Sequence, residues 1–414
     1  LLLLLKQKNN KRCIFREGNI VRLQINKGEF MKSWQTAERS TSSKSTINSL
    51  TGILLKTAGT DDENTVLLEA TDLKTSIKCV SRGILVEEEG EAVLPVKVVG
   101  ELFKKAPTNV FTVSVAEGKG LIIAGRNKYR FSTYPSKEFP TLPVSESAPF
   151  FCTITASELL RTLSEGTIAS TIGEEFPKYL GTAFFQLKEG ELRIISTDGR
   201  RLSLSKCHPV EKGEDGDFLL PISGLKELQR LLGSTDGETP VRIVVDSTLV
   251  FFQMGSLEFS VRRVEAVFPN YEKILNPQST TTLDVDRSLL IAALERVDVI
   301  VRDFSRMVLF RLSPEGDLIL MGKAPETGAV EEILEGKIEG EPLTVAFNVG
   351  FLLDGLKALY GDRAFVSFNG PEGQMTMLRP GETDFLYMVM PIKLTENDLS
   401  FEEKEEEGEE FPPA

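Results

Sequence analysis

The sequence is poor in the residues that most often carry catalysis or bind metals. Its 414 residues include one histidine, His208, and four cysteines, none of them in a Cys-x-x-Cys pair. No glycine pattern has the spacing of a phosphate-binding loop, and no apolar run is long enough to cross a membrane. No nucleophile, base and orienting group can be assembled from what remains. We therefore expect neither an enzyme nor a metal or other cofactor, and the cysteine usage indicates a reduced, cytoplasmic setting.

Charge is unevenly distributed along the chain. The formal net charge is −13. Residues 395–414 carry nine acids and one lysine, whereas residues 1–20 carry five bases and one glutamate. We predict that both ends lie outside the folded domains, the first as a disordered upstream extension and the second as a disordered acidic tail. An acidic body argues against polyanion binding over the whole surface, but it is compatible with one localised basic face.

The chain contains an internal repeat. The segments Thr71-Asp72-Leu73-Lys74 and Thr197-Asp198-Gly199-Arg200 each follow an apolar strand and precede an alternating one. Phe139-Pro140 in the first copy corresponds to Phe268-Pro269 in the second. All three copies open with a short strand followed by apolar residues at helical spacing. A period of roughly 130 residues is too long for a solenoid, so we predict three tandem α+β domains over 21–148, 149–278 and 279–394.

Each repeat is predicted to supply two helices. These predicted helices cover residues 27–40, 98–105, 157–165, 222–232, 287–299 and 349–359. Most carry lysine or arginine beside an apolar stripe, and for any single helix an ordinary solvated face explains the charge. If symmetry placed all six on one concave face, their charges would form a positive surface that attracts phosphates without reading bases.

Taken together, these features resemble the bacterial sliding clamps, the beta subunits of the DNA polymerase III holoenzyme. The resemblance spans residues 21–394. It rests on the threefold repeat, on Leu180 with the segment Thr197–Leu202, on Phe268-Pro269-Asn270-Tyr271, and on the closing segment Tyr387–Leu394. It implies a head-to-tail homodimer whose six clamp domains form a ring, with helices inside and sheets outside. Such a ring encircles duplex DNA as a processivity factor in DNA replication and has no catalytic site of its own.

The resemblance also implies partners and sites. The expected partners are double-stranded DNA, a second copy of the chain, a clamp loader, replicative and repair polymerases, and other proteins with clamp-binding peptides, all in the nucleoid-associated cytoplasm and none in a membrane. The implied peptide pocket comprises Leu180, Thr197, Gly199, Arg200, Arg201, Leu202, Pro269, Lys273, Ile274, Phe304, Asn348, Phe351, Met388, Val389, Met390, Pro391, Ile392, Lys393 and Leu394. The cations expected to face DNA are Lys32, Arg39, Lys44, Lys104, Lys105, Arg161, Lys226, Arg230, Arg287, Arg296 and Lys357. The expected dimer interface contains Tyr129, Phe131, Val299 and Ile300.

Some positions depart from the family pattern. Arg200 stands where histidine is usual, and Lys273 and Lys393 stand where arginine is frequent, so the peptide preference is open. The acidic tail continues beyond Leu394, where the family chain usually stops, and it could compete with peptides for the cations of the pocket.

The sequence leaves two other interpretations of the function open. One is a three-domain structural or ligand-binding protein without a role on DNA, and the other is an enzyme whose site has no recognisable motif. Salt-dependent retention on circular but not linear DNA would distinguish a clamp from both.

Overall fold

The computed structural model describes residues 21–57, 64–171, 173, 177–275, 279–314, 316–379, 381 and 383–395. The predicted upstream extension, and the predicted tail beyond Thr395, lie outside these residues. The chain divides into two compact units. The first comprises Leu1–Phe150 and Thr239–Arg262, and the second comprises Phe151–Glu238 and Arg263–Ala414. The first unit therefore holds the first repeat together with three strands of the second.

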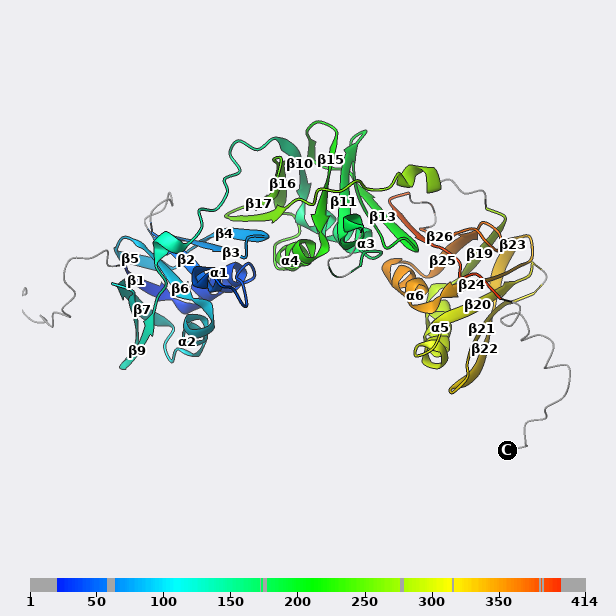
Figure 1. Cartoon of the computed structure of the whole chain (residues 1–414), viewed down its shortest axis with the longest axis horizontal. Helices are drawn as coiled ribbons and strands as arrows, with labels where there is room; N and C mark the ends of the chain where they lie inside the picture. The colour runs from blue at the N-terminus through cyan, green and yellow to red at the C-terminus, as the bar shows by residue number, and fades with distance from the viewer. Residues whose placement is uncertain are drawn as a thin grey trace, which may run out of the picture. The chain divides into compact units, whose positions relative to one another are not determined.

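A five-stranded antiparallel sheet forms one half of the first repeat, in the order β5-β1-β7-β8-β9 (Figure 1). Its strands are β1 (Val21–Asn26), β5 (Ile84–Glu88), β7 (Val110–Ala116), β8 (Lys119–Ala124) and β9 (Asn127–Ser132). Burial alternates strictly along β1, as expected of a strand with one face on a core. Strand β9, which carries Tyr129, lies at the edge of this sheet, since among the described strands it pairs with β8 alone.

The other strands of the first unit form a continuous antiparallel run in the order β16-β17-β18-β4-β3-β2-β6. They are β2 (Gly52–Lys56), β3 (Val66–Thr71), β4 (Thr75–Ser81), β6 (Glu91–Pro95), β16 (Pro240–Val245), β17 (Leu249–Met254) and β18 (Leu257–Arg262). Strand β18 of the second repeat pairs with β4 of the first. This pairing joins two repeats through backbone hydrogen bonds rather than through side chains alone.

Two helices pack against each other in the first unit, α1 (Lys27–Glu38) and α2 (Glu101–Lys105). The Asn26 side chain caps α1 by accepting a hydrogen bond from the Gly28 amide at 3.1 Å. Behind them lies an aromatic core in which the Phe30, Trp34 and Phe103 rings meet at 5.1–5.8 Å. The predicted helix over 98–105 begins earlier, because a π-helical turn η2 (Val96–Gly100) precedes α2. The 3-10 turns η1 (Asn48–Thr51) and η3 (Ser136–Glu138) complete this unit.

A nine-stranded antiparallel sheet dominates the second unit, in the order β15-β11-β12-β13-β27-β26-β25-β19-β23. Its strands are β11 (Thr182–Lys188), β12 (Glu191–Thr197), β13 (Arg201–Cys207), β15 (Gly216–Pro221), β19 (Thr281–Asp286), β23 (Gly336–Gly340), β25 (Arg363–Phe368), β26 (Met375–Leu378) and β27 (Phe385–Val389). The last strand of the described residues, β27, pairs with β13 of the second repeat and so joins the second repeat to the third.

A separate four-stranded sheet of the second unit has the order β22-β21-β20-β24. Its strands are β20 (Met307–Leu312), β21 (Leu318–Ala324), β22 (Gly328–Leu334) and β24 (Leu343–Asn348). The short strand β14 (Glu211–Lys212) pairs with β10 (Phe150–Thr155). The 3-10 turns η4 (Lys178–Gly181) and η5 (Tyr271–Ile274) flank the strands of the second repeat.

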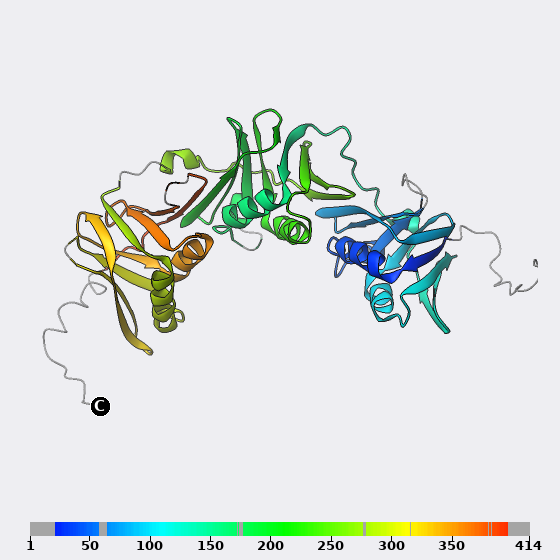
Figure 2. The same ribbon diagram turned by 180° about the vertical axis from the view of Figure 1, so that it is seen from behind.

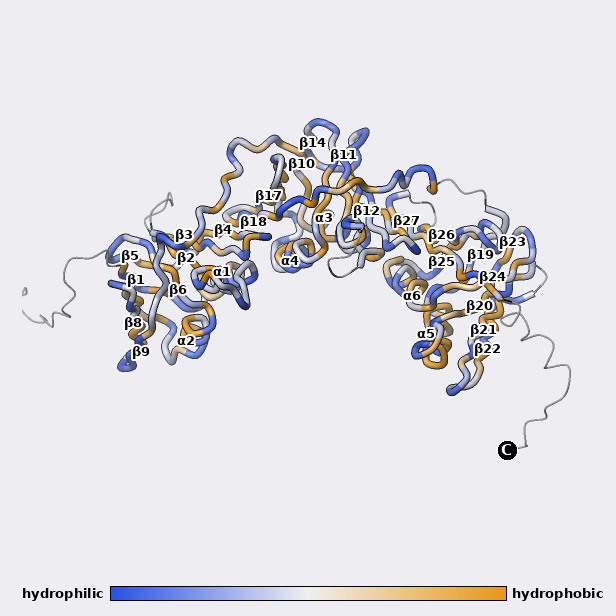
Figure 3. Tube along the Cα trace, in the orientation of Figure 1, coloured by the Kyte–Doolittle hydropathy of each residue, from blue (hydrophilic) through white to orange (hydrophobic). Residues whose placement is uncertain are grey.

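Four helices of the second unit form two contacting pairs (Figures 1 and 2). They are α3 (Ala156–Gly166) with α4 (Ile222–Gly233), and α5 (Arg287–Val301) with α6 (Val349–Ala358). Side chains cap three of them: Thr155 for α3, Asp286 for α5 and Asn348 for α6. Figure 3 shows apolar residues along α5 and α6, whose inner faces pack in the core of the third repeat. The predicted helix starts and ends agree with these bounds to within two residues.

Three of the four cysteines, Cys79, Cys152 and Cys207, are free and buried. Burial raises the pKa of Cys79 to about 12 and that of Cys207 to about 11. Thiols in this state are poor nucleophiles at neutral pH, so these three are structural. No helix of the described segments is both long and apolar enough to cross a bilayer.

Candidate functional site

The corner between β12 and β13, residues Thr197–Arg201, is fixed by its own side chains. Thr197 Oγ1 donates to the Arg201 carbonyl at 2.7 Å and accepts from the Gly199 amide at 3.1 Å. Asp198 Oδ1 accepts from the amides of Arg200 and Arg201 at 2.9 and 3.0 Å. Gly199 has a φ of +83°, a conformation that glycine adopts without strain. The corner is therefore rigid, with Gly199 and Arg200 exposed at its tip.

Arg201 ties this corner to helix α6. Its guanidinium bonds Asp198 at 2.9 Å, Asp354 at 2.6 Å and the Tyr387 hydroxyl at 3.0 Å. It also lies 4.3 Å from the centre of the Phe351 ring. Burial opposes its charge, but the hydroxyl and the two carboxylates raise the pKa of Arg201 above its usual value. All of its main partners are internal, so Arg201 orients Phe351 rather than offering a free charge to a peptide.

The end of the chain runs alongside the same corner. Leu202 pairs with Met388 across β13 and β27, and both are buried. The Met390 amide then donates to the Arg200 carbonyl at 2.8 Å, and the Ile392 amide donates to the Ala346 carbonyl at 2.8 Å. Backbone bonds thus hold the segment after β27 between the corner and β24. Among its side chains Met390 is exposed and Ile392 is half-buried.

The predicted pocket residues therefore divide into a supporting layer and an exposed layer. Thr197, Leu202, Met388 and Val389 are buried. The exposed or half-exposed residues are Leu180, Gly199, Arg200, Arg201, Pro269, Lys273, Ile274, Phe304, Asn348, Phe351, Met390, Pro391, Ile392, Lys393 and Leu394. Phe304 is 66% exposed, a large value for an aromatic ring with no solvent-facing polar group. We use the name C-terminal groove for these exposed or half-exposed residues of the predicted peptide pocket.

Two further features support the C-terminal groove. The Phe268 ring stacks on Phe184 at 4.9 Å and contacts the buried Tyr271, which anchors η5 and the exposed Ile274 beside it. Asn348 Oδ1 accepts from the Gly350 and Phe351 amides. Asn348 was predicted to belong to the peptide pocket, and the oxygen of its side-chain amide is already used as the cap of α6.

At least five of the eleven predicted DNA-facing cations, Arg161 among them, have carboxylate partners in their own unit. The ion pairs are Lys105–Glu101, Arg230–Glu227, Arg296–Glu332 and Lys357–Glu295, all with exposed cations. Arg287 instead bonds the Leu356 and Gly361 carbonyls at the end of α6. Arg39 and Lys104 are exposed, and within the described segments Lys32, Lys44 and Lys226 make no ion pair. The helix surfaces thus carry lysines and arginines together with many of their own counter-charges.

Arg161 belongs to a buried charge network that the sequence did not predict. Arg379, only 2% exposed, bonds Asp384 at 2.8 Å and also bonds Glu165. Arg161 bonds Glu165 at 2.8 Å and Asp384 at 3.0 Å. The Arg379 guanidinium also lies over the rings of Tyr360 and Phe385, at 4.0 and 4.8 Å. Because α3 belongs to the second repeat and Arg379 to the third, the network fastens the two repeats together.

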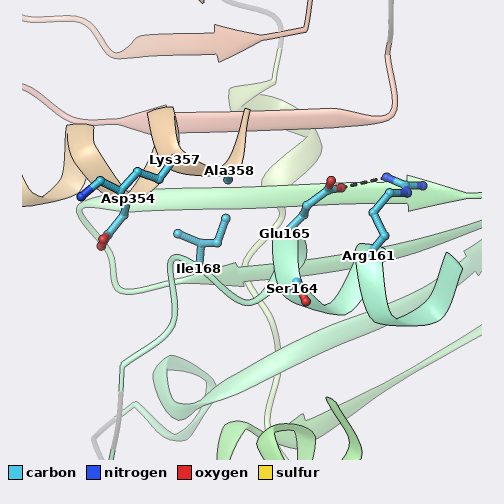
Figure 4. A pocket seen from close by; sticks show the side chains of 7 residues that line it. All are labelled: Arg161, Ser164, Glu165, Ile168, Asp354, Lys357 and Ala358. Carbon is cyan, nitrogen blue, oxygen red and sulfur yellow. Dashed lines mark hydrogen bonds and ion pairs between the residues drawn. The ribbon is translucent and has the colours of Figure 1, made fainter. Parts of the chain in front are cut away.

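Beside this network lies a recess of about 400 Å³ between α3 and α6 (Figure 4). Arg161, Ser164, Glu165 and Ile168 line one side, and Asp354, Lys357 and Ala358 line the other. Its lining contains two cations, Arg161 and Lys357, and two carboxylates, Glu165 and Asp354, so the charges of the recess balance. Arg161 was predicted to face DNA, but its guanidinium points to Glu165 and Asp384, and its primary role is structural.

Comparison with known proteins identifies the family. Three family models match in series: the N-terminal domain of the DNA polymerase III beta subunit over residues 21–143, its central domain over 153–270 and its C-terminal domain over 272–393. The chain belongs to this family. The predicted resemblance and the α+β fold of three tandem clamp domains are thereby confirmed.

Individual relatives agree with the family. The beta sliding clamp of Pseudomonas putida is 29% identical over 355 residues, which cover 85% of this chain and 94% of the relative. That of Synechococcus elongatus is 28% identical over 331 residues, 79% of this chain and 88% of the relative. The crystal structure of the Thermotoga maritima beta subunit matches with a TM-score of 0.82 at 27% identity, covering 91% of this chain and all of that one. A Pseudomonas aeruginosa sliding clamp bound to griselimycin matches with a TM-score of 0.83 at 25% identity, covering 90% and 100%.

The buried network yields a prediction of stability. Replacing Arg379 by Met leaves Glu165 buried with one of its two cations, Arg161, so we expect the free energy of unfolding of the second unit to fall by about 3–5 kcal/mol. The double variant Glu165→Gln/Arg379→Met should lose less than the sum of the two single changes, because the partners interact. Urea denaturation followed by far-UV circular dichroism measures the free energy of unfolding of the single and double variants.

Arg363→Met is the matched control. Arg363 also pairs with a carboxylate of the same unit, Asp284 at 2.8 Å, but both groups are substantially exposed. Its loss should cost at most about 1 kcal/mol. Equal losses for Arg379→Met and Arg363→Met would contradict a structural role for the network.

Proposed function

We propose that this chain is a DNA sliding clamp, a non-catalytic ring that encircles duplex DNA and tethers the replicative polymerase and other DNA-processing proteins. The observation that carries the proposal is the series of three family domains over 21–393, which includes the corner and the chain end that build the C-terminal groove. We place the protein in the cytoplasm at the nucleoid. A clamp loader would open the ring with ATP that the clamp itself does not bind.

The proposed ring is a head-to-tail homodimer. A heterologous interface closes into a ring when two different surfaces of one chain meet their counterparts on the other. One surface is the edge strand β9, which carries Tyr129, and the other is the end of α5, where Val299 is 57% exposed. Ile300 is half-exposed beside it. Phe131 is 9% exposed and its ring lies over Gly120, so it shapes the edge rather than reaching far out of it.

The C-terminal groove is the proposed peptide site. Its exposed apolar side chains, Ile274, Phe304 and Met390, offer anchoring surface, and methionine adapts to partners of different shape. Apolar anchors in a desolvated groove supply most of the binding energy, while charges at the rim steer the approach. Arg200, Lys273 and Lys393 are exposed and form that rim. The family-type ligand is a glutamine-led peptide containing leucine and phenylalanine.

The inner surface is proposed to contact DNA through the cations of the helices. The exposed members are Lys32, Arg39, Lys44, Lys104, Lys105, Arg230, Arg296 and Lys357, with Lys226 half-exposed. Few contacts at any instant suit a protein that must not settle into one register on the duplex. Backbone phosphates carry no base sequence, so the binding should be independent of sequence.

Ring assembly provides the first test. Val299→Asp places a charge in the proposed interface and should shift the chain from dimer to monomer at micromolar concentration in light scattering. Leu289→Asp is the matched control, since Leu289 is a 58% exposed apolar residue on the same helix. It should remain dimeric. A dimeric Val299→Asp variant would place the interface elsewhere.

Peptide binding provides the second test. A chain that ends at Val389 should bind a fluorescein-labelled family-type peptide more than about tenfold more weakly, because it loses Met390 and Ile392. The control is a chain that ends at Thr395, which lacks only the acidic tail and should bind at least as tightly as the full chain. Fluorescence anisotropy measures all three. Undiminished binding by the shorter chain would refute the assignment of the groove, provided that its dimer is intact.

DNA retention provides the third test. Changing Lys32, Lys44 and Lys226 to Gln should shorten residence on loaded circular DNA and reduce the slope of log residence time against log salt, by at most about 0.9 per phosphate contact. The control changes Lys119, Lys212 and Lys337 to Gln. These exposed lysines lie on strands β8, β14 and β23 rather than on helices. Release of the intact protein on linearisation of the DNA is expected throughout. Equal salt slopes for both triple variants would argue against an inner basic lining.

A further inference from the structure

The corner between β3 and β4 in the first unit has the same hydrogen bonds as the corner between β12 and β13. Thr71 Oγ1 donates to the Thr75 carbonyl at 2.7 Å and accepts from the Leu73 amide at 3.0 Å. Asp72 Oδ1 accepts from the Lys74 and Thr75 amides at 2.9 and 2.7 Å. Each bond has its counterpart in the Thr197–Arg201 corner. The two corners are therefore copies of one structure.

The strand beside each corner is also equivalent. Val261 pairs with Thr75 as Val389 pairs with Arg201. The Arg262 amide donates to the Lys74 carbonyl at 2.9 Å, just as the Met390 amide donates to the Arg200 carbonyl at 2.8 Å. Arg262 consequently occupies in the first unit the position that Met390 occupies at the C-terminal groove.

Leu73 stands where the other corner has Gly199. Its φ is +72°, in the left-handed region that a branched apolar residue rarely adopts. The side chain gains little burial in return, since 51% of Leu73 is exposed. Glycine would hold this turn without strain, as Gly199 does. Residues with a strained backbone that the fold does not require occur mostly at ligand-binding and active sites.

A recess of about 130 Å³ adjoins Leu73. Pro140, Leu142, Pro143 and Leu249 give it apolar walls, and the exposed Lys74 and Arg262 stand at its rim. A cavity of about 150 Å³ accommodates benzene, so this recess has room for one aliphatic or prolyl side chain. The recess and its rim together offer one apolar subsite beside two positive charges.

We propose that this corner is a second peptide site, distinct from the C-terminal groove and selective for an acidic segment. The ligand is an extended peptide that inserts one leucine or proline side chain into the recess and places carboxylates near Lys74 and Arg262. The inference rests on the proposed peptide-binding function, because it transfers that role to the equivalent corner. Replacement of the apolar Met390 by Arg262 changes the preferred ligand from an apolar peptide to an acidic one. One chain could then hold two different peptides at once.

Methyl NMR of the full-length chain tests the proposal. The probe is the N-acetylated, C-amidated peptide Asp-Glu-Leu-Pro-Glu, titrated at low salt while the leucine, isoleucine and methionine methyl signals are followed. We expect saturable shifts of Leu73 and Leu249, weakened by added salt because the rim charges are exposed. Ile274 and Met390, which report on the C-terminal groove, should not move.

Two variants distinguish ligand binding from a purely structural role. Leu73→Gly relieves the strained backbone and should leave the remaining spectrum and the thermal stability intact, yet raise the dissociation constant of the probe about fivefold or more. Arg262→Glu should raise it by a similar factor through charge reversal. Lys119→Glu makes the same charge change at another exposed site of the first unit and should leave binding unchanged.

The outcomes separate this inference from the function on which it rests. Shifts confined to Ile274 and Met390, or a probe affinity unaltered by both Leu73→Gly and Arg262→Glu, would overturn the second site. The same sample is then titrated with the glutamine-led family-type peptide. If that peptide moves Ile274 and Met390, the proposed function stands although the second site is refuted. If it moves neither, the C-terminal groove is refuted on its own evidence.

Discussion

The pairing of β27 with β13 is the interaction on which the second unit depends. It makes one antiparallel sheet out of strands from two repeats, and it brings the end of the chain to the Thr197–Arg201 corner. Without it Met390 and Ile392 would have no fixed position, because their backbone bonds to Arg200 and Ala346 continue the same path. The C-terminal groove is therefore a product of sheet continuity. Its walls come from segments almost 200 residues apart, yet backbone hydrogen bonds set their spacing.

The buried charges reinforce this joint in a different way. Strand pairing fixes register along β13 and β27, whereas the Arg379–Glu165 pair fixes helix α3 against the third repeat. A buried ion pair adds less net stability than apolar packing of similar volume. It nevertheless fixes one arrangement of the two side chains, because a buried charge without its partner lowers the stability of the fold. The aromatic rings on both sides of Arg379 restrict its movement further. Register and orientation are thus secured by separate means.

The sequence predicted what short-range patterns encode. The helices followed from the helical spacing of apolar residues, and the Thr-Asp corners followed from comparing repeats. The roles of single side chains were less predictable. From the sequence we expected Arg201 and Arg161 to be cations available to ligands. Each is instead bound by an acid that is distant in sequence, Arg201 by Asp354 and Arg161 by Asp384. Arg379 and Glu165 are 214 positions apart, and no periodicity links such a pair. Only the packed structure shows which charges are already neutralised.

The central place of β27 in its sheet has a consequence for synthesis of the protein. Strand β13 ends at Cys207, and the strand that covers its free edge is not complete until Val389 has been made. At a translation rate of 5–20 residues per second, that edge of β13 stays unpaired for roughly 10–40 s while the chain is still on the ribosome. During this time the nascent second repeat exposes unpaired backbone groups and apolar side chains such as Leu202 and Leu204, which are the features that template aggregation. Correct folding of this unit is therefore limited by translation of the last strand, and a premature stop shortly before it would release an edge that other chains can pair with.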